Sequence, residues 1–164
     1  MLHRLAVSLV VLFLAAGCGS SGKPSGGSPG FYDGPAFVVA MNKAYATYTW
    51  PSDRRPDLQK LIDQNKPGTG QKRQAGAERM VLGIINTCAW YLSWNDARQR
   101  GDAPAVDKAL AVMTNVIPGY TAGSPDNQQY VIDAARKASL GDSTKALNYV
   151  SANCDSSTVR WLPA

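Results

Sequence analysis

The chain has 164 residues and a formal net charge of +5, with 45% hydrophobic and 18% charged residues. This is the composition of an ordinary globular protein, and the length suits one domain with a core of its own. The basic residues are scattered and are not interleaved with aromatic residues, so nucleic acid is not an expected partner.

The N-terminal segment has the layout of a secretory signal peptide. A short positive start ends at Arg4 and is followed by an apolar run over residues 5–16, interrupted only by Ser8. This run is shorter than the roughly 20 residues that a membrane-spanning helix needs. We therefore expect residues 1–17 to be removed.

The residues around the expected cut, Leu14-Ala15-Ala16-Gly17-Cys18, resemble the lipobox of bacterial lipoproteins. That family usually carries Leu three residues before the cysteine, where this chain has Ala15, with Leu14 one residue earlier. The resemblance implies that Cys18 carries diacylglycerol, that a further acyl chain such as palmitate is often added, and that the protein is anchored on the extracytoplasmic face of the cell membrane. The alternative is an ordinary secretory cleavage after Ala16 or Gly17, with Cys18 an incidental thiol.

Residues 18–30 are the expected lipidated cysteine and a Gly/Ser/Pro tether. Residues 19–30 offer no apolar side chain to bury, and a flexible coil of this length spans roughly 20 Å. Without Arg4 the mature chain keeps 16 Lys and Arg against 12 Asp and Glu. The resulting charge of about +4 suits a surface that faces anionic lipids or cell-wall polymers.

Residues 31–164 are expected to form one all-α domain, a bundle of five or six helices. Apolar residues recur at three- and four-residue steps, and no alternating strand pattern of useful length is visible. Trp50-Pro51 should end the first helix, Pro118-Gly119 should end the fourth, and residues 65–76 should form a loop. The expected helices cover residues 35–48, a short segment from about 56, about 75–100, about 102–117, a helix starting near 124, and a last helix that ends near 154.

The residue inventory argues against most catalytic and metal chemistry. The only histidine, His3, is lost with the signal peptide, and the two cysteines that remain after Cys18 are far apart in the sequence. Triads of the Ser-His-Asp and Cys-His kinds are therefore excluded, and we expect no metal site and no cofactor. Residues 66–72 are only superficially like a phosphate-binding P-loop, because Gln71 separates the glycine from the lysine.

Glu78 is the one candidate catalytic residue, because it is the only glutamate and lies near the start of the longest expected helix. It could act as a general acid in the cleavage of cell-wall glycan, as in helical lytic transglycosylases, although Arg79-Met80 differs from the Glu-Ser pattern of that family. A solvated carboxylate at the positive end of a helix explains Glu78 equally well.

Two further features concern binding and stability. Trp90 and Trp94 lie one helical turn apart, with Tyr45, Tyr48, Trp50, Tyr120 and Trp161 available nearby, so they form either a binding surface or core packing. Cys88 and Cys154 are expected to form a disulfide in an oxidising compartment, with two separate buried thiols as the alternative.

Together these features predict a lipid-anchored binding or interaction module of the cell envelope. Its expected partners are the membrane, through the lipid anchor, and either an envelope protein or a cell-wall polymer. The alternative function is a glycan-cleaving enzyme that uses Glu78.

Overall fold

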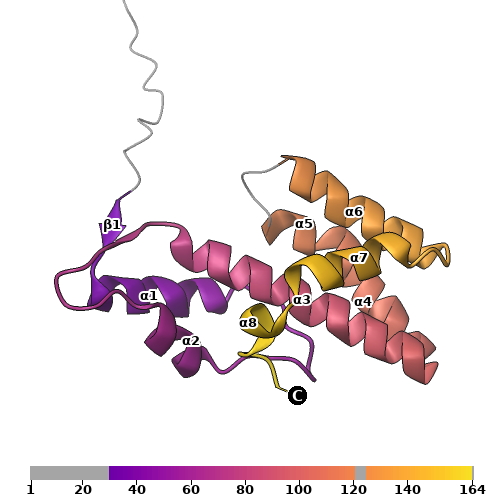
Figure 1. Cartoon of the computed structure of the whole chain (residues 1–164), viewed down its shortest axis with the longest axis horizontal. Coiled ribbons are helices and arrows are strands. Elements are labelled where there is room, and N and C mark those ends of the chain that lie inside the picture. Colours follow the sequence, from indigo (N-terminus) through magenta and orange to yellow (C-terminus); the bar gives the residue numbers. More distant parts are fainter. Residues whose placement is uncertain (1–29, 121–124, 164) are drawn as a thin grey trace, which may run out of the picture.

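The computed structural model describes residues 30–120 and 125–163, so the signal peptide and Cys18 lie outside the described residues. This part of the chain is largely helical, and the all-α prediction is confirmed (Figure 1). The helices are α1 (Gly34–Tyr45), α2 (Leu58–Asn65), α3 (Ala77–Arg100), α4 (Ala103–Asn115), α5 (Ile117–Tyr120), α6 (Pro125–Ser139), α7 (Thr144–Asn153) and α8 (Ser156–Val159). Two strands, β1 (Phe31–Tyr32) and β2 (Arg73–Gln74), form an antiparallel pair.

Helix α3 is the central element and corresponds to the longest helix that the sequence predicted. Its 24 residues make it about 36 Å long. One apolar core packs α1 and α2 against its N-terminal half, and a second packs α4, α6 and α7 against its C-terminal half. Figure 1 shows α1 and α2 toward one end of α3, and α4 and α6 toward the other. A single helix therefore connects the two cores.

Aspartates fix the starts of four helices, with Asp155 at α8, by accepting hydrogen bonds from backbone amides that have no partner inside the helix. Asp33 accepts from the amide of Ala36 at 3.0 Å, and Asp102 accepts from that of Ala105 at 3.1 Å. Asp57 does the same for α2. These caps explain why the helices begin where they do.

The first helix ends earlier than the sequence predicted. Helix α1 stops at Tyr45, and Thr47 turns the chain by donating its hydroxyl hydrogen bond to the carbonyl of Ala44 at 2.7 Å. The residues that follow leave the helix because α3 binds the Thr49 carbonyl, as described below. The apolar periodicity continued to Tyr48, but this tertiary contact overrides it.

The predicted stop at Pro118-Gly119 is also displaced. Helix α4 ends at Asn115, and Pro118 and Gly119 form the middle of the short helix α5. Proline is tolerated in the first turn of a helix, where its missing amide hydrogen has no partner to lose. The described chain thus has eight helices, of which α5 and α8 are four-residue turns and the other six correspond to the expected bundle.

The β1–β2 pair was not expected, because two-residue strands have no periodicity to detect. Phe31 lies opposite Gln74, and Tyr32 lies opposite Arg73. The amide of Ala75 also donates to the carbonyl of Gly30 at 2.7 Å. This pairing holds the start of the domain against the loop that precedes α3.

The predicted disulfide is present between Cys88 and Cys154, whose Cα atoms lie 5.5 Å apart. It ties the end of α7 to the middle of α3. Among the described residues, no helix is both long and apolar enough to cross a membrane.

Candidate functional site

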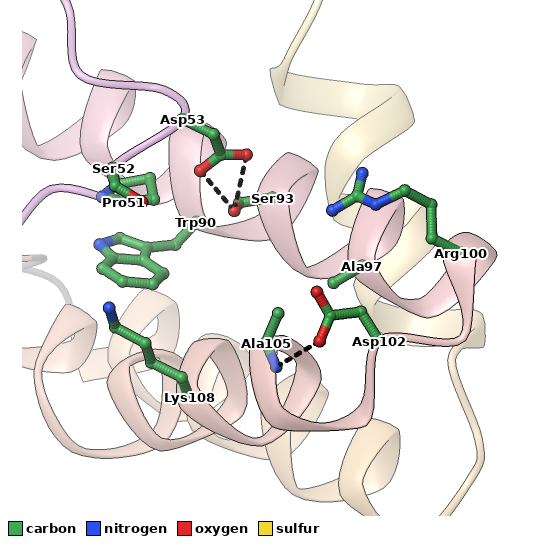
Figure 2. A pocket seen from close by; sticks show the side chains of 10 residues that line it. All are labelled: Pro51, Ser52, Asp53, Trp90, Ser93, Ala97, Arg100, Asp102, Ala105 and Lys108. Carbon is green, nitrogen blue, oxygen red and sulfur yellow. Dashed lines mark hydrogen bonds between the residues drawn. The ribbon is translucent and has the colours of Figure 1, made fainter.

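A pocket of about 240 Å³ lies between residues 51–53, the C-terminal half of α3 and the start of α4 (Figure 2). Its lining mixes an aromatic ring with acidic, basic and hydroxyl groups. The lining residues are Pro51, Ser52, Asp53, Trp90, Ser93, Ala97, Arg100, Asp102, Ala105 and Lys108.

The wall formed by residues 51–53 is held by hydrogen bonds from α3 to the residues before it. The carbonyl of Thr49 accepts from both Asn86 Nδ2 and Trp90 Nε1, each at 2.8 Å. Pro51 is buried, and Arg54 pairs with Asp96 on α3. Residues 51–53 are therefore fixed to α3 both before the segment, at Thr49, and after it, at Arg54.

Asp53 presents a carboxylate at the upper side of the pocket in Figure 2. The hydroxyl of Ser93 lies 2.8 Å and 3.0 Å from its two oxygens. The Asp53 side chain is still 47% exposed. It can accept further hydrogen bonds from a ligand while Ser93 holds its orientation.

A second carboxylate and two cations also line the pocket. Asp102 caps α4 through the amide of Ala105, and Figure 2 shows it on the same side of the pocket as Arg100. Lys108 extends from α4 toward the indole of Trp90. Neither Arg100 nor Lys108 forms an ion pair with any described residue. Both remain available to an anionic group.

The charged and hydroxyl groups of the pocket can recognise a small polar ligand. Two carboxylates can accept hydrogen bonds from hydroxyl or ammonium groups, and two cations can pair with a carboxylate or phosphate. Within residues 30–120 and 125–163 there is no cluster of three or more possible metal-ligating side chains.

The structure places both predicted tryptophans in the core, which is one of the two alternatives that their spacing left open. Trp90 and Trp94 are 2% and 1% exposed, respectively. Trp90 alone reaches the pocket lining. Trp94 packs within the second core, and the Arg98 guanidinium lies 5.6 Å from its ring centroid. The pair does not form an open stacking surface.

Glu78 lies outside the pocket, three helical turns before Trp90. It is 4% exposed, and its Oε2 accepts a hydrogen bond from the amide of Gly76 at 2.9 Å. Its other oxygen lies 3.9 Å from the guanidinium of Arg79. This carboxylate is buried against the start of α3 and bonded to the amide of Gly76, so it is not the solvated group that the sequence suggested.

Four of the aromatic residues expected near these tryptophans gather where α1 ends: Tyr45, Tyr48, Trp50 and Tyr120. The rings of Tyr48 and Tyr120 lie 4.2 Å apart between centroids, and Trp50 stacks on Tyr45 at 5.2 Å. Burial raises the pKa of Tyr48 to about 12, and the neighbouring Tyr120 adds to the shift. Tyr48 donates its hydroxyl hydrogen bond to the carbonyl of Arg79 at 3.0 Å. This cluster joins the end of α1 to α3 and α5.

Sequence reasoning identified Trp90 as a candidate but missed the charged residues around it. Asp102 marked only the expected start of a helix near residue 102, and Ser93, Arg100 and Lys108 carried no motif. A helical projection could have placed Trp90, Ser93 and Ala97 on one face of α3. Nothing in the local sequence shows that Asp53 packs against that face.

No family profile, curated protein or solved structure matches this chain.

Proposed function

We propose that the chain is a lipid-anchored binding module of the cell envelope and that its ligand site is the pocket between residues 51–53, α3 and α4. One observation supports this most directly. Arg100 and Lys108 have no ion-pair partner among the described residues, and they face a pocket whose other wall is rigidly held. An opposite-charge site on packed helices is the arrangement expected for recognition of a small polar ligand.

The volume limits the size of the ligand. A space of about 240 Å³ corresponds to roughly eight water molecules. One sugar ring or one to two amino acids can enter it, and a longer polymer can present only one unit at a time. Peptidoglycan offers both kinds of unit, with hydroxyl groups for the carboxylates and peptide carboxylates for the cations.

The test is sedimentation of the mature protein with insoluble peptidoglycan. We expect the wild type to sediment and a variant with Arg100→Glu and Lys108→Glu to lose at least about tenfold in affinity, because paired charge-assisted bonds contribute roughly 1.5–3 kcal/mol each. The matched control reverses two exposed cations outside the pocket that form no ion pair with a described residue, Lys43→Glu and Lys60→Glu, and should bind like the wild type. Equal binding by all three proteins would remove the pocket from the proposal.

The same incubation tests the rival function. Fragments released by the wild type but not by a Glu78→Gln variant would establish glycan cleavage. Glu78 is buried, is bonded to Gly76 and does not line the pocket, so it does not face a ligand held there.

A further inference from the structure

A second, larger groove lies near the other end of α3 from the pocket. It has a volume of about 560 Å³ and opens between the start of α1 and residues 66–72. Pro35, Val38 and Pro67 give it an apolar lining. Figure 1 shows β1, the start of α1 and this loop together at one end of the molecule, and the C-terminal end of α3 at the other.

The N-terminal part of the chain joins the domain beside this groove. Gly30 is held by the amide of Ala75, and β1 pairs with β2 in the same loop. Residues 19–30 form the expected tether from the lipidated Cys18, with a span of roughly 20 Å. This end of the domain is therefore the end that a lipid anchor would keep nearest to the membrane.

The charge of this end suits an anionic surface. Lys72 and Arg73 are exposed and form no ion pair with a described residue. The sequence has no carboxylate between Asp63 and Glu78, and both of these are engaged: Asp63 with Lys66 at 3.0 Å, and Glu78 with the amide of Gly76. The remaining acidic group beside the groove, that of Asp33, accepts the bond that caps α1.

Exposed apolar side chains accompany these cations. Phe31 is 67% exposed and lies on β1 opposite Gln74, on one face of the strand pair, whereas Arg73 lies opposite Tyr32, on the other face. Val39, on α1, is 69% exposed. An exposed aromatic ring and basic residues at the same end of a domain are the combination that binds at the boundary between headgroups and acyl chains.

We propose that this surface, defined by Phe31, Lys72 and Arg73 with the groove beside them, binds the anionic phospholipid headgroups of the membrane that anchors the chain. The proposal rests on the proposed lipid anchor for its geometry. The domain is then held with α3 directed away from the bilayer, and its length of about 36 Å carries the pocket toward the cell wall.

The experiment uses the mature chain from residue 19 without lipid, which retains both apolar cores. Its binding is measured to vesicles of phosphatidylcholine containing phosphatidylglycerol and to vesicles of phosphatidylcholine alone. We expect binding to the anionic vesicles only, weakened by added salt. Lys72→Glu with Arg73→Glu should lower it at least about tenfold, because each basic residue near an anionic surface contributes a factor of about five. Phe31→Ser should lower it as well.

Two controls separate this proposal from the proposed function. The pocket variant with Arg100→Glu and Lys108→Glu should bind vesicles like the wild type, and the Lys72→Glu/Arg73→Glu variant should still sediment with peptidoglycan. The proposed membrane-binding surface would be overturned if the Lys72→Glu/Arg73→Glu variant bound vesicles as well as the pocket variant does. Equal binding of the wild type to both kinds of vesicle would overturn it too. The proposal would also fail if the wild type did not bind vesicles and the Lys72→Glu/Arg73→Glu variant lost binding to peptidoglycan. That result would assign Lys72 and Arg73 to binding of the wall polymer.

Discussion

Asp133 shows how single charged residues join the helices of the second core. Its carboxylate accepts hydrogen bonds from Lys145 at 2.7 Å and from Arg136 at 2.9 Å, and Lys145 also lies over the ring of Tyr130. Because Lys145 belongs to α7 and Asp133 to α6, the pair connects two helices. The hydrogen bond from Lys145, followed by that from Arg136, lowers the pKa of Asp133 below its ordinary value of 3.8.

This lowered pKa predicts a pH-dependent stability. A carboxyl group with a depressed pKa in the folded protein stabilises the fold above the ordinary value, and that contribution is lost as the pH falls through the folded pKa. We expect Asp133→Asn to destabilise the protein near neutral pH and the difference from wild type to shrink below about pH 4. Urea unfolding at a series of pH values measures it, with Asp107→Asn as the control for loss of an exposed charge. A difference that does not change with pH would contradict the prediction.

The pocket residues illustrate what the sequence could not show at this scale. The spacing of Trp90 along α3 predicted which side of the helix is apolar, but the pocket depends on contacts between distant segments. Ser93 and Asp53 are 40 residues apart, and Arg54 and Asp96 are 42 residues apart. No local sequence pattern predicts such pairs, because each of these polar residues by itself is typical of a protein surface.

At the scale of elements, the end of α3 depends on a backbone conformation that glycine adopts most readily. Gly101 has a φ of +71°, and its amide donates to the carbonyls of Ala97 and Arg98. Space for a side chain is available there, so the cost of a substitution is conformational. This residue sets the angle at which α4 returns and thus the mouth of the pocket.

We therefore expect Gly101→Ala to lower the free energy of unfolding by about 1 kcal/mol. The matched control is Gly119→Ala, because Gly119 also has open space around its Cα but lies in α5 without a positive φ. It should be neutral or slightly stabilising. Chemical denaturation of the two variants measures the difference, and equal stabilities would show that the turn tolerates a side chain.

The sequence predicted long elements well and short ones poorly. The expected helices over about 75–100 and about 102–117 correspond to α3 and α4, because apolar residues recur along both at three- and four-residue steps. The helix α5 and the β1–β2 pair were missed, since four- and two-residue elements have no measurable period. Tertiary contacts with neighbouring segments stabilise these short elements, and such contacts are not visible in the local sequence.

The whole molecule combines the two cores with a predicted lipid anchor. Replacing Cys18 with Ser should block lipidation, because the serine hydroxyl is not the thiol to which diacylglycerol is joined. Two or more acyl chains contribute roughly 0.8 kcal/mol per buried methylene, far more than the headgroup contacts of Lys72 and Arg73. Labelled palmitate and membrane fractionation measure the outcome. If the Cys18→Ser protein still incorporates palmitate, the resemblance to a lipobox has misidentified the anchor.

The disulfide connects the two cores through the C-terminal segment. Cys154 follows α7 in the second core, whereas Trp161 and Leu162 pack against the first core. The bond to Cys88 therefore fixes the point from which the last residues cross from one core to the other. Reduction of the disulfide should therefore release the C-terminal segment from α3 and expose apolar surface of the first core.

Closing a loop of 66 residues stabilises the folded state on the order of 4 kcal/mol, according to the chain-entropy account. We therefore expect reductant to lower the urea midpoint of the wild type strongly, because that energy is a large share of the stability of a small domain. A double variant, Cys88→Ala with Cys154→Ala, should already unfold at the lower midpoint and should not respond to reductant. Mass spectrometry after alkylation of the unreduced protein provides the decisive check. Two labelled thiols would show that the bond does not form. The position of the C-terminal segment would then depend on the packing of Trp161 and Leu162 alone.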